Sequence, residues 1–466
     1  MRSILFVFVV ILSACNVGEK YKYNEFISDD EIKETLNIEA NSKDISSNWY
    51  EIFKDSDLNT LILYLEKTNI NILQAISRLK QSRQQLNIYS KKMYPIIDIN
   101  GKFDYQKSNN KDFSFNDTNN FQVGFDASWE IDIWGRGKNI SDQYFEIMQQ
   151  AKYNLSDVKL SMTSEMIKNY INLRLAQEKF RITNKNLKLQ EETLQTIRDK
   201  YNAGIADELD LNQAILNVEQ TKSSIPLLRD DIEKSKNAIS VLLGVLPNDI
   251  PVNLDKYTKN ITAHTFKYSV KELYKTPLKN IRNRADIRAV EQSIKIQNAV
   301  VNQAIIDLYP TLDIGASLGF ISNSVRRLFY QNKQIYGYAP NVTLPIWHWG
   351  MLKNNIELQK SIKEEYVLNY NEALLTAIME IKDNIVLIKE TLEANKHLKN
   401  ARNQTKNILD ITRIKYQNGI IEFVELARAE QELLKAENSL VENNAKILQN
   451  LTSFYKSVGG GYSINN

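Results

Sequence analysis

Histidine and cysteine, two side chains that often perform chemistry, are scarce in this chain and stand apart from one another. None of its three histidines, His264, His348 and His397, has a cysteine or a pair of carboxylates at the spacing of a metal site. The sequence also contains no phosphate-binding glycine loop and no serine elbow. We therefore expect no catalytic residue, no bound metal and no cofactor-binding site, and we predict that the protein is not an enzyme.

The one cysteine stands at the end of an apolar run that follows a short basic start. This order is typical of a secretory signal, and the run from Ile4 to Leu12 is too short for a membrane-spanning helix. Residues Leu12-Ser13-Ala14-Cys15 are similar to the lipobox of bacterial lipoproteins, after which the cysteine is acylated on its sulfur and its new amino terminus. We predict a covalent lipid on Cys15; an ordinary signal with an incidental cysteine is the alternative.

Charge is nearly balanced along the chain. The 59 basic and 56 acidic side chains leave a formal net charge of +3. No basic block stands out, which argues against nucleic acid as a partner. With only 8 prolines and 15 glycines in 466 residues, few breaks interrupt the chain, and we expect long secondary-structure elements.

The sequence contains an internal repeat, whose two copies are related by a fixed shift of 215 positions. The equivalent pairs are Tyr94-Pro95 with Tyr309-Pro310, Trp134-Gly135 with Trp349-Gly350, and Gly204-Ile205 with Gly419-Ile420. Such residues fix turns and buried anchors, so two copies of one structural unit follow. We expect a signal peptide (1–14), an extended lipid-anchored segment (15–57), repeat 1 (58–250), a linker lying on the helices (251–283), repeat 2 (284–458) and a tail (459–466).

Each repeat is expected to hold a long helical hairpin. No Gly or Pro occurs between Lys138 and Ala203 or between Met351 and Asn418, so each stretch predicts roughly 100 Å of helix. Gly204 and Gly419 should form the hairpin turns, after which helical patterns resume at Glu208–Leu243 and Glu422–Phe454. Pro226 should kink or break the first of these.

Apolar residues every seven positions indicate coiled-coil seams, at Phe180, Leu187, Leu194 and Tyr201 and at Leu387, Ala394, Ala401 and Ile408.

Shorter helices, about 58–92 and 285–308, should stop at Pro95 and Pro310. The apolar period then changes to two, which predicts strands near 96–107 and 121–131 in repeat 1 and near 311–321 and 336–346 in repeat 2. Four strands of about ten residues match an outer-membrane barrel in length but are too few to close one. Closure must then come from other subunits. The predicted fold class is a mixed α and β membrane protein.

These landmarks resemble the outer membrane factor family of tripartite efflux systems, the TolC-like proteins, in its lipoprotein branch serving resistance-nodulation-division pumps. The resemblance covers nearly the whole chain. It rests on Trp49-Tyr50 with Phe53, on Arg284-Ala285-Asp286-Ile287-Arg288 with Ala where the family has Pro, on the strand exit Leu344-Pro345-Ile346-Trp347-His348-Trp349-Gly350, and on Val458-Gly459-Gly460-Gly461. By family analogy, Asn16 after the cysteine permits export to the outer membrane.

The resemblance implies a homotrimer whose four-stranded sheets close a twelve-stranded barrel in the outer membrane, continued by a periplasmic helical tunnel. Such a protein is a passive, gated exit duct. Its partners would be outer membrane lipid, a periplasmic adaptor, and an inner-membrane resistance-nodulation-division pump that provides the energy. The junction residues Pro95, Trp134, Gly135, Pro310, Trp349 and Gly350 would join strands to helices.

The resemblance also implies a gate at the two hairpin turns. The acidic ring of similar proteins lies six residues after the turn glycine, which corresponds to Asp210 in repeat 1 and to Glu425, in place of the usual aspartate, in repeat 2. Arg428 stands where relatives have a gating arginine, Tyr416 where they have a tyrosine in the lock, and Ile421 at an apolar constriction. Acidic rings would favour cations in the pore. The alternative is that these charges stabilise helix dipoles and solvate the surface.

Two other functions remain open at this point. A lipid-anchored coiled-coil scaffold of the cell envelope would explain the helices, but it needs no paired strands. An exit duct for a type I protein secretion system would keep the fold and change the pump, and only analogy favours the efflux branch. The exported cargo does not follow from the sequence, since selection usually lies in the pump.

Overall fold

The computed structural model describes residues 21–22, 26–36, 48–106, 118–255 and 281–460. Cys15, His264 and most of the predicted linker lie outside these residues. The chain divides into two compact units, one containing 1–25, 78–152 and 289–371, the other 26–77, 153–288 and 372–466. Each sequence repeat contributes to both units, so the compact units do not follow the boundaries of the repeats.

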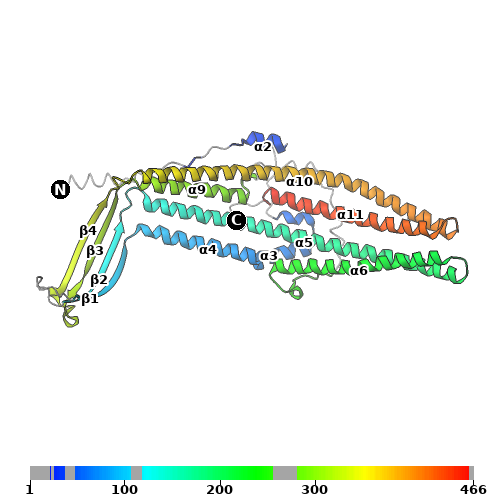
Figure 1. Cartoon of the computed structure of the whole chain (residues 1–466), viewed down its shortest axis with the longest axis horizontal. Helices are drawn as coiled ribbons and strands as arrows, with labels where there is room; N and C mark the ends of the chain where they lie inside the picture. Colours follow the sequence, from blue (N-terminus) through cyan, green and yellow to red (C-terminus); the bar gives the residue numbers. More distant parts are fainter. Residues whose placement is uncertain (1–20, 23–25, 37–47, 107–117, 256–280, 461–466) are drawn as a thin grey trace. The chain divides into compact units, whose positions relative to one another are not determined.

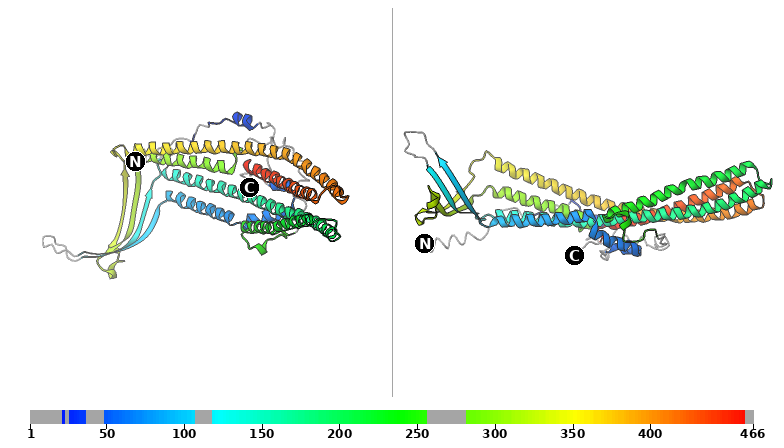
Figure 2. Two further views of the ribbon diagram at one scale, coloured as in Figure 1. Left: turned by 45° about the vertical axis from the view of Figure 1, so that its right-hand side comes forward. Right: turned by 90° about the horizontal axis from the view of Figure 1, so that it is seen from below.

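Four antiparallel strands form one sheet in the first unit, in the order β1 (Ile96–Gln106), β2 (Thr118–Glu130), β3 (Thr311–Ser322) and β4 (Gln334–Thr343) (Figures 1 and 2). The register follows the repeat, because Ile96 pairs with Ser128 in the first hairpin and Thr311 pairs with Thr343 in the second. The strands thus lie at or within a few residues of the predicted ranges. β4 ends at Thr343, three residues before the predicted end, and it contains Pro340 opposite Ile314.

The sheet has one apolar face. Successive side chains of a strand point to opposite faces, so the alternating apolar residues of each strand share a side. They are largely exposed in the single chain, for example Ile99 at 67% and Tyr338 at 83%. The pairing of β2 with β3 joins the two repeats. The strands β1 and β4 are the edges of the sheet, and each pairs along one side only.

The long helices form where the sequence lacks glycine and proline, as predicted. α5 (Arg136–Asn202) and α10 (Met351–Gln417) each have 67 residues, and they are followed by α6 (Glu208–Leu243) and α11 (Phe423–Ser457). Pro226 lies inside α6 and does not break it. Among the described residues, no helix is both long and apolar enough to cross a membrane.

The helix expected over 58–92 is in fact two helices, α3 (Ser56–Thr68) and α4 (Ile70–Ser90). Asn69 separates them, because its side-chain amide donates to the Leu242 carbonyl at 2.7 Å while its oxygen accepts from the Ile72 amide at 3.0 Å. A polar side chain that bonds to backbone in this way caps a new helix instead of continuing the old one. The other short helix, α9 (Ala285–Ile306), lies as predicted.

The segment 15–57 is not extended throughout. Its described part contains α2 (Asp29–Leu36), and the Ser28 and Glu31 side chains each accept a hydrogen bond from the other residue's amide, which is a capping box. Farther on, Trp49, Tyr50 and Phe53 are buried, and the Trp49 ring stacks on Tyr455 at 5.2 Å. Burial of these aromatic rings ties this part of the segment to the C-terminal helix.

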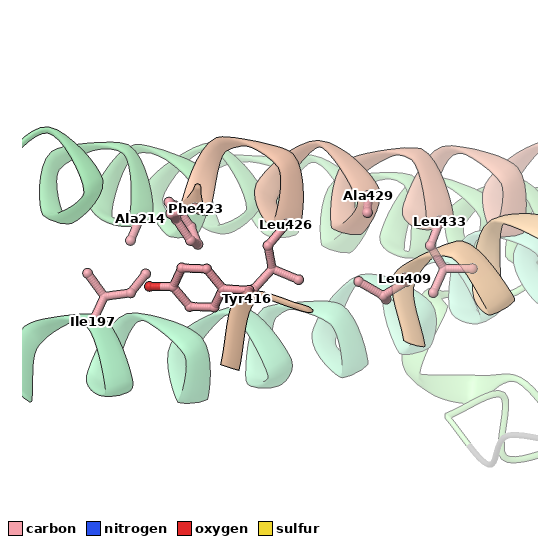
Figure 3. Packing of buried hydrophobic residues seen from close by; sticks show 8 residues of the cluster. All are labelled: Ile197, Ala214, Leu409, Tyr416, Phe423, Leu426, Ala429 and Leu433. Carbon is pink, nitrogen blue, oxygen red and sulfur yellow. The ribbon is translucent and has the colours of Figure 1, made fainter. Parts of the chain in front are cut away.

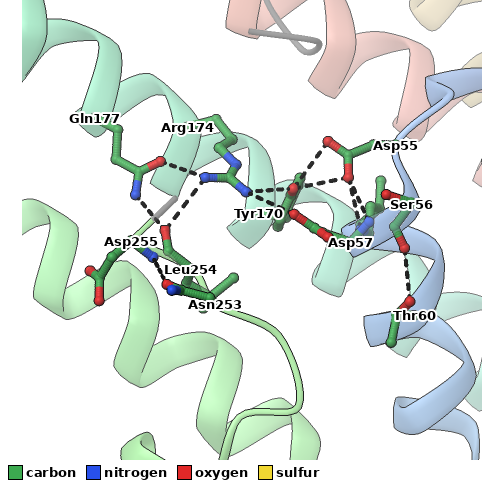
Figure 4. A network of polar contacts seen from close by, with 11 residues as sticks. Asp55, Ser56, Asp57, Thr60, Tyr170, Arg174, Gln177, Asn253, Leu254 and Asp255 are labelled. Carbon is green, nitrogen blue, oxygen red and sulfur yellow. Dashed lines mark hydrogen bonds and ion pairs between the residues drawn. The ribbon is translucent and has the colours of Figure 1, made fainter. Parts of the chain in front are cut away.

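A buried polar network then leads from α3 to α5 (Figure 4). Asp55 caps α3 and accepts a hydrogen bond from the Tyr170 hydroxyl at 3.0 Å. That hydroxyl accepts from the Arg174 guanidinium at 2.8 Å, and Gln177 donates to the Leu254 carbonyl at 2.7 Å. The start of the predicted linker, as far as it is described, therefore lies on α5.

The motif Arg284 to Arg288 has a structural role in the second unit. The Arg284 guanidinium donates to Asp286 at 2.7 Å, to Glu380 of α10 at 2.9 Å and to the Ser457 carbonyl of α11 at 2.7 Å. A buried guanidinium with three acceptors thus joins the start of α9 to the middle of α10 and the end of α11, which are far apart in sequence.

The two predicted coiled-coil seams differ in burial. On α5, Phe180, Leu187 and Leu194 are half-buried, whereas the fourth predicted member, Tyr201, is 39% exposed. On α10, by contrast, Leu387 and Ile408 are 49% and 54% exposed in the single chain. The seam on α10 therefore has no complete packing partner among the described residues of one chain.

Candidate functional site

Two hairpin turns in the second unit carry the residues that the sequence predicts for a gate. In the first turn the Ile205 amide donates to the Lys200 carbonyl at 2.8 Å, and in the second the Ile420 amide donates to the Lys415 carbonyl at 2.9 Å. This six-to-one bond is that of a Schellman motif, which requires a left-handed residue. Gly204 has a φ of 72° and Gly419 a φ of 69°. The two turns therefore have the same backbone design, at equivalent positions of the repeat.

The helix starts that follow the turns are capped differently. Asp207 precedes α6, and its carboxylate accepts from the Asp210 amide at 2.8 Å. Glu422 precedes α11 at the equivalent position and makes no side-chain capping bond. An Asp at this position stabilises a helix by satisfying a free amide, whereas the longer Glu side chain is not among the preferred caps.

A compact apolar cluster lies directly beneath the turns and joins all four helices of the two hairpins (Figure 3). Tyr416 and Phe423 meet edge to face at 5.9 Å between ring centroids, and Phe423 is only 1% exposed. The other buried members are Ile197, Ala214, Leu409, Leu426, Ala429 and Leu433. The cluster holds the two turns together as one packed end.

Tyr416 and Ile421 belong to this packing. Tyr416 is 8% exposed, and the Lys200 ammonium lies over its ring at 4.5 Å from the centroid. Ile421 is partly buried against the same cluster. Burial and the nearby Asp210 carboxylate raise the pKa of the Tyr416 hydroxyl, so this hydroxyl stays protonated at physiological pH. In the single chain both residues therefore fix the turn from below.

Asp210 lies beside the acidic residues of both turns. It is half-buried, and burial together with Asp207 and Glu422 raises the pKa of its carboxyl above the ordinary value. Lys200 acts in the opposite direction. The structure thus brings Asp210 of the first repeat close to the start of α11 in the second, where like charges repel one another.

Glu425 and Arg428 form a weak pair on one helix. Their charged atoms are 4.0 Å apart in an i,i+3 arrangement, with side chains 55% and 73% exposed. An exposed pair of this kind contributes about 0–1 kcal/mol. Both side chains are therefore largely solvated in the single chain and are accessible to other groups.

A buried carboxylate deeper in the bundle was not predicted from the sequence. Glu430 is 2% exposed, and it accepts hydrogen bonds from Thr193 of α5 at 3.2 Å and from Asn217 of α6 at 3.3 Å. The Arg413 guanidinium of α10 lies 3.8 Å away. Burial raises the pKa of the Glu430 carboxyl, although these three neighbours oppose the shift.

The same pattern recurs one heptad farther along α11. Glu437 accepts from Arg402 of α10 at 3.1 Å and from Asn186 of α5 at 3.4 Å. Both glutamates lie on the helix face that also buries Phe423, Leu426 and Leu433. A carboxylate on the apolar face of an amphipathic helix was the signal that could have identified them.

The predicted strand-to-helix junctions lie in the first unit. The Trp134 indole donates to the Pro310 carbonyl at 2.7 Å, and its ring centroid lies 5.0 Å from that of Tyr309. These contacts attach repeat 1 directly to repeat 2. The equivalent Trp349 is 87% exposed and has a φ of 53°. Trp129 also donates to the Met93 carbonyl at 2.9 Å, just before Pro95. Gly135 and Gly350 share a φ of 80°.

Comparisons with known proteins agree on one family. The sequence matches the family described as outer membrane efflux protein over residues 62–245 and 278–460. It is 23% identical to the cation efflux system protein CusC of Escherichia coli O6:H1, over 98% of both chains. It is 24% identical to the solvent efflux pump outer membrane protein SrpC of Pseudomonas putida, over 89% and 87% of the two chains. The crystal structure of the Campylobacter jejuni CmeC outer membrane channel superposes with a TM-score of 0.87 at 23% identity, covering 97% of this chain and 96% of that one.

Proposed function

This chain belongs to the outer membrane efflux protein family, and from that premise we propose that three copies of it assemble into one continuous duct. The protein is an outer membrane component of an efflux system, with a part that extends into the periplasm, and it serves as the exit duct. Its named relatives are efflux components and not enzymes.

The open sheet is the observation that supports a shared barrel. A membrane barrel has to close, because lipid offers no partner to the backbone groups of a free strand edge. Here the sheet has four strands, an apolar face and two edge strands, β1 and β4. Three such sheets give twelve strands, and an even number in this range is usual for bacterial barrels.

The helices support the same assembly. The apolar seam on α10, with Leu387 and Ile408 exposed, would be covered by a helix of another copy. Long helices need partners along their length, because most helical stability comes from the packing of an apolar face. A coiled-coil scaffold without a barrel would leave the apolar face of the sheet unexplained.

The partners and the lipid complete the proposal. We infer that a periplasmic adaptor contacts the helical end, that an inner-membrane resistance-nodulation-division pump drives export, and that a lipid on Cys15 attaches the chain to the membrane. CusC is named for cations and SrpC for solvents. Such different cargoes in relatives of one fold suit a passive duct whose pump selects the cargo.

The gate in this proposal is the end of the duct formed by the hairpin turns. Glu425, Arg428 and Asp210 would meet the same residues of other copies there, while Tyr416 and Ile421 support the turn from below. Because each exposed ion pair contributes about 0–1 kcal/mol, closure would depend on several contacts repeated by symmetry. Docking of an adaptor would then need to supply only a few kcal/mol, by this order-of-magnitude argument.

Single-channel conductance in planar bilayers tests the duct and the gate together. We expect a small, cation-preferring conductance for the wild type and a larger one for Glu425→Ala and for Arg428→Ala. Glu432→Ala is the matched control, since Glu432 is an exposed α11 glutamate outside the pair, and it should leave the conductance unchanged. Conductance that neither gate variant changes would refute this gate. Folded trimers that form no channels would refute the duct.

A further inference from the structure

The two β-hairpins differ in the charge of the segments that join their strands. In the sequence, segment 107–117 of the first hairpin carries two lysines and two aspartates, so its charges cancel. Segment 323–333 of the second hairpin, called here the cationic loop, carries two arginines and one lysine. The sequence contains no Asp or Glu anywhere from 314 to 356. The second hairpin is therefore positively charged without any compensating acid.

The cationic loop is held in shape by its own hydrogen bonds. It contains two short 3₁₀ turns, η5 (Val325–Arg327) and η6 (Gln331–Lys333). The Tyr330 amide donates to the Arg327 carbonyl at 3.2 Å, and the Lys333 amide donates to the Tyr330 carbonyl at 2.8 Å. A loop that is already ordered in this way loses little conformational freedom when it binds a ligand.

An aromatic ring of the cationic loop lies on the apolar face of the sheet. Phe329 meets Phe320 of β3 edge to face at 5.5 Å between ring centroids. Phe320 shares that face with Leu318, and Leu318 lies opposite Tyr336 of β4, whose side chain is largely exposed in the single chain. Exposed aromatic rings near strand ends are typical of the girdle that a membrane barrel has at the boundary of lipid and water.

The length of β3 places the cationic loop at the level of the lipid headgroups. The strand has 12 residues, and with a rise of about 3.3 Å per residue and a tilt of about 45° it spans roughly 28 Å along the membrane normal. The apolar band of a membrane barrel is about 25 Å tall. The helices adjoin the other end of the strands and form the part that extends into the periplasm, so the cationic loop lies on the outer side of the membrane (Figure 1).

The two arginines of the cationic loop have no counter-ion within the part of the chain that the structure describes. Arg326 and Arg327 are exposed, and neither guanidinium forms an ion pair or a hydrogen bond with a described residue. The repeat shift of 215 positions replaces them by Lys111 and Asp112, whose charges cancel. A guanidinium presents parallel N–H donors that match a phosphate group. Both guanidinium groups are therefore available to a phosphate outside the chain.

We propose that the cationic loop binds the phosphate groups of anionic lipid headgroups in the outer leaflet. Arg326 and Arg327 bind the phosphates, Lys333 adds a third positive charge, and Phe329 lies at the boundary with the acyl chains. The position of Phe329 on the apolar face favours a lipid over a protein of the cell surface, because a protein partner needs no ring on the side that faces lipid. This inference rests on the proposed function, since it requires the sheet to span the outer membrane.

Lipid binding by the full-length trimer in detergent tests this site. The probe is diphosphorylated lipid A, measured as bound lipid per trimer by native mass spectrometry. Phosphatidylcholine is the zwitterionic comparison, and we expect the wild type to bind lipid A in preference to it. Each cation near an anionic surface contributes about a fivefold factor in affinity, so Arg326→Ser with Arg327→Ser should weaken the binding of lipid A roughly 25-fold.

The first hairpin supplies a matched control. Lys107→Ser with Lys111→Ser removes the same charge from the segment that joins β1 to β2. It should weaken the binding of lipid A far less, because Asp112 and Asp117 already neutralise that segment. Equal losses in the two double variants would show attraction by net charge alone and would overturn the site.

Two further variants separate charge from shape. Arg326→Lys with Arg327→Lys keeps the charge but removes the paired donors, so its affinity for lipid A should lie between those of the wild type and the serine variant. Phe329→Ala keeps both guanidinium groups and removes the ring that contacts Phe320. It should also weaken the binding of lipid A, and unchanged binding would refute the role of the ring.

The remaining outcomes distinguish the lipid from other partners and this inference from the duct. Displacement of lipid A by an equal concentration of inorganic phosphate would assign the cationic loop to a free anion and overturn the lipid contact. Unchanged binding in the variant with both Arg326→Ser and Arg327→Ser would also overturn it and leave the loop as a surface for a protein. Either result in trimers that still conduct in planar bilayers leaves the duct intact. Folded trimers without channels would instead refute the proposed function.

Discussion

Replacing Gly419 by alanine should weaken one hairpin turn and leave its repeat equivalent intact. The φ of 69° lies in the left-handed region, and a Cβ at this position meets no atom within 4 Å. Backbone strain is therefore the only cost, and it amounts to about 1–2 kcal/mol for an L-residue. Because no side chain has to move, the magnitude follows from the conformation alone.

Hydrogen exchange measured by mass spectrometry reports this cost locally. The Ile420 amide is protected by its bond to the Lys415 carbonyl. A loss of about 1–2 kcal/mol raises the open population roughly 5–30-fold, and exchange of this amide should accelerate by that factor. The equivalent Ile205 amide in the first turn is an internal control and should exchange as in the wild type.

Two further variants separate strain from other effects. Gly419→Asn should exchange more slowly than Gly419→Ala, because asparagine tolerates the left-handed region better. Gly101→Ala also adds a Cβ in open space, at a residue without positive φ, and should leave exchange at both turns unchanged. If Gly419→Ala exchanged no faster than the wild type at Ile420, the argument that φ limits this turn would be refuted.

Two more predictions concern the packing beneath the turns. Phe423→Ala should lower the free energy of unfolding by about 3–5 kcal/mol, measured by urea unfolding in detergent, because it leaves a cavity beside Tyr416. Val424→Ala, at a position 39% exposed, should cost clearly less, and an equal loss would contradict the assigned packing. Glu430 has a carboxyl pKa raised above 4.5 by burial, so the folded chain keeps a proton that the unfolded chain has released. The free energy of unfolding should therefore fall as pH rises from the unfolded to the folded pKa of this carboxyl. Glu430→Gln should reduce that fall but leave the part that other carboxyls with raised pKa values, such as Asp157 and Asp210, contribute. An unaltered pH dependence in this variant would refute the assignment.

The repeat made much of this fold predictable. Glycine and proline are so sparse that their positions predict the ends of α5, α6 and α10 to within one or two residues. The two hairpins were predictable because an apolar period of two needs no tertiary context to be recognised. Pairing of β2 with β3, which joins the repeats, could not be inferred from periodicity, since it depends on contacts between distant segments.

Other features depended on single side chains. Asn69 ends one helix and starts the next through a bond to the Leu242 carbonyl, a residue far away in sequence. The helix α2 depends on the reciprocal cap of Ser28 and Glu31, which lies in a segment that otherwise reads as extended. Local hydrogen bonds of this kind override the average pattern.

The candidate gate was predictable in position but not in detail. The sequence places Asp210, Tyr416, Ile421, Glu425 and Arg428 near two turns, and the structure shows where each side chain lies in one chain. It also adds Glu430 and Glu437, which a charge count treats as surface residues. Their burial depends on partners from three other helices, and no spacing within α11 reveals those partners. The gating roles themselves stay predictions.

The different caps of the two turns have a mechanical consequence. α6 starts at a satisfied Asp207 cap, while α11 starts at Glu422 without one, and a helix cap stabilises its first turn by about 1 kcal/mol. The end of the proposed trimer would then carry six hairpin tips that alternate between stiff and compliant. Motion at this end would begin at the three compliant tips, which are those carrying Glu425 and Arg428, while the stiff tips serve as a fixed frame.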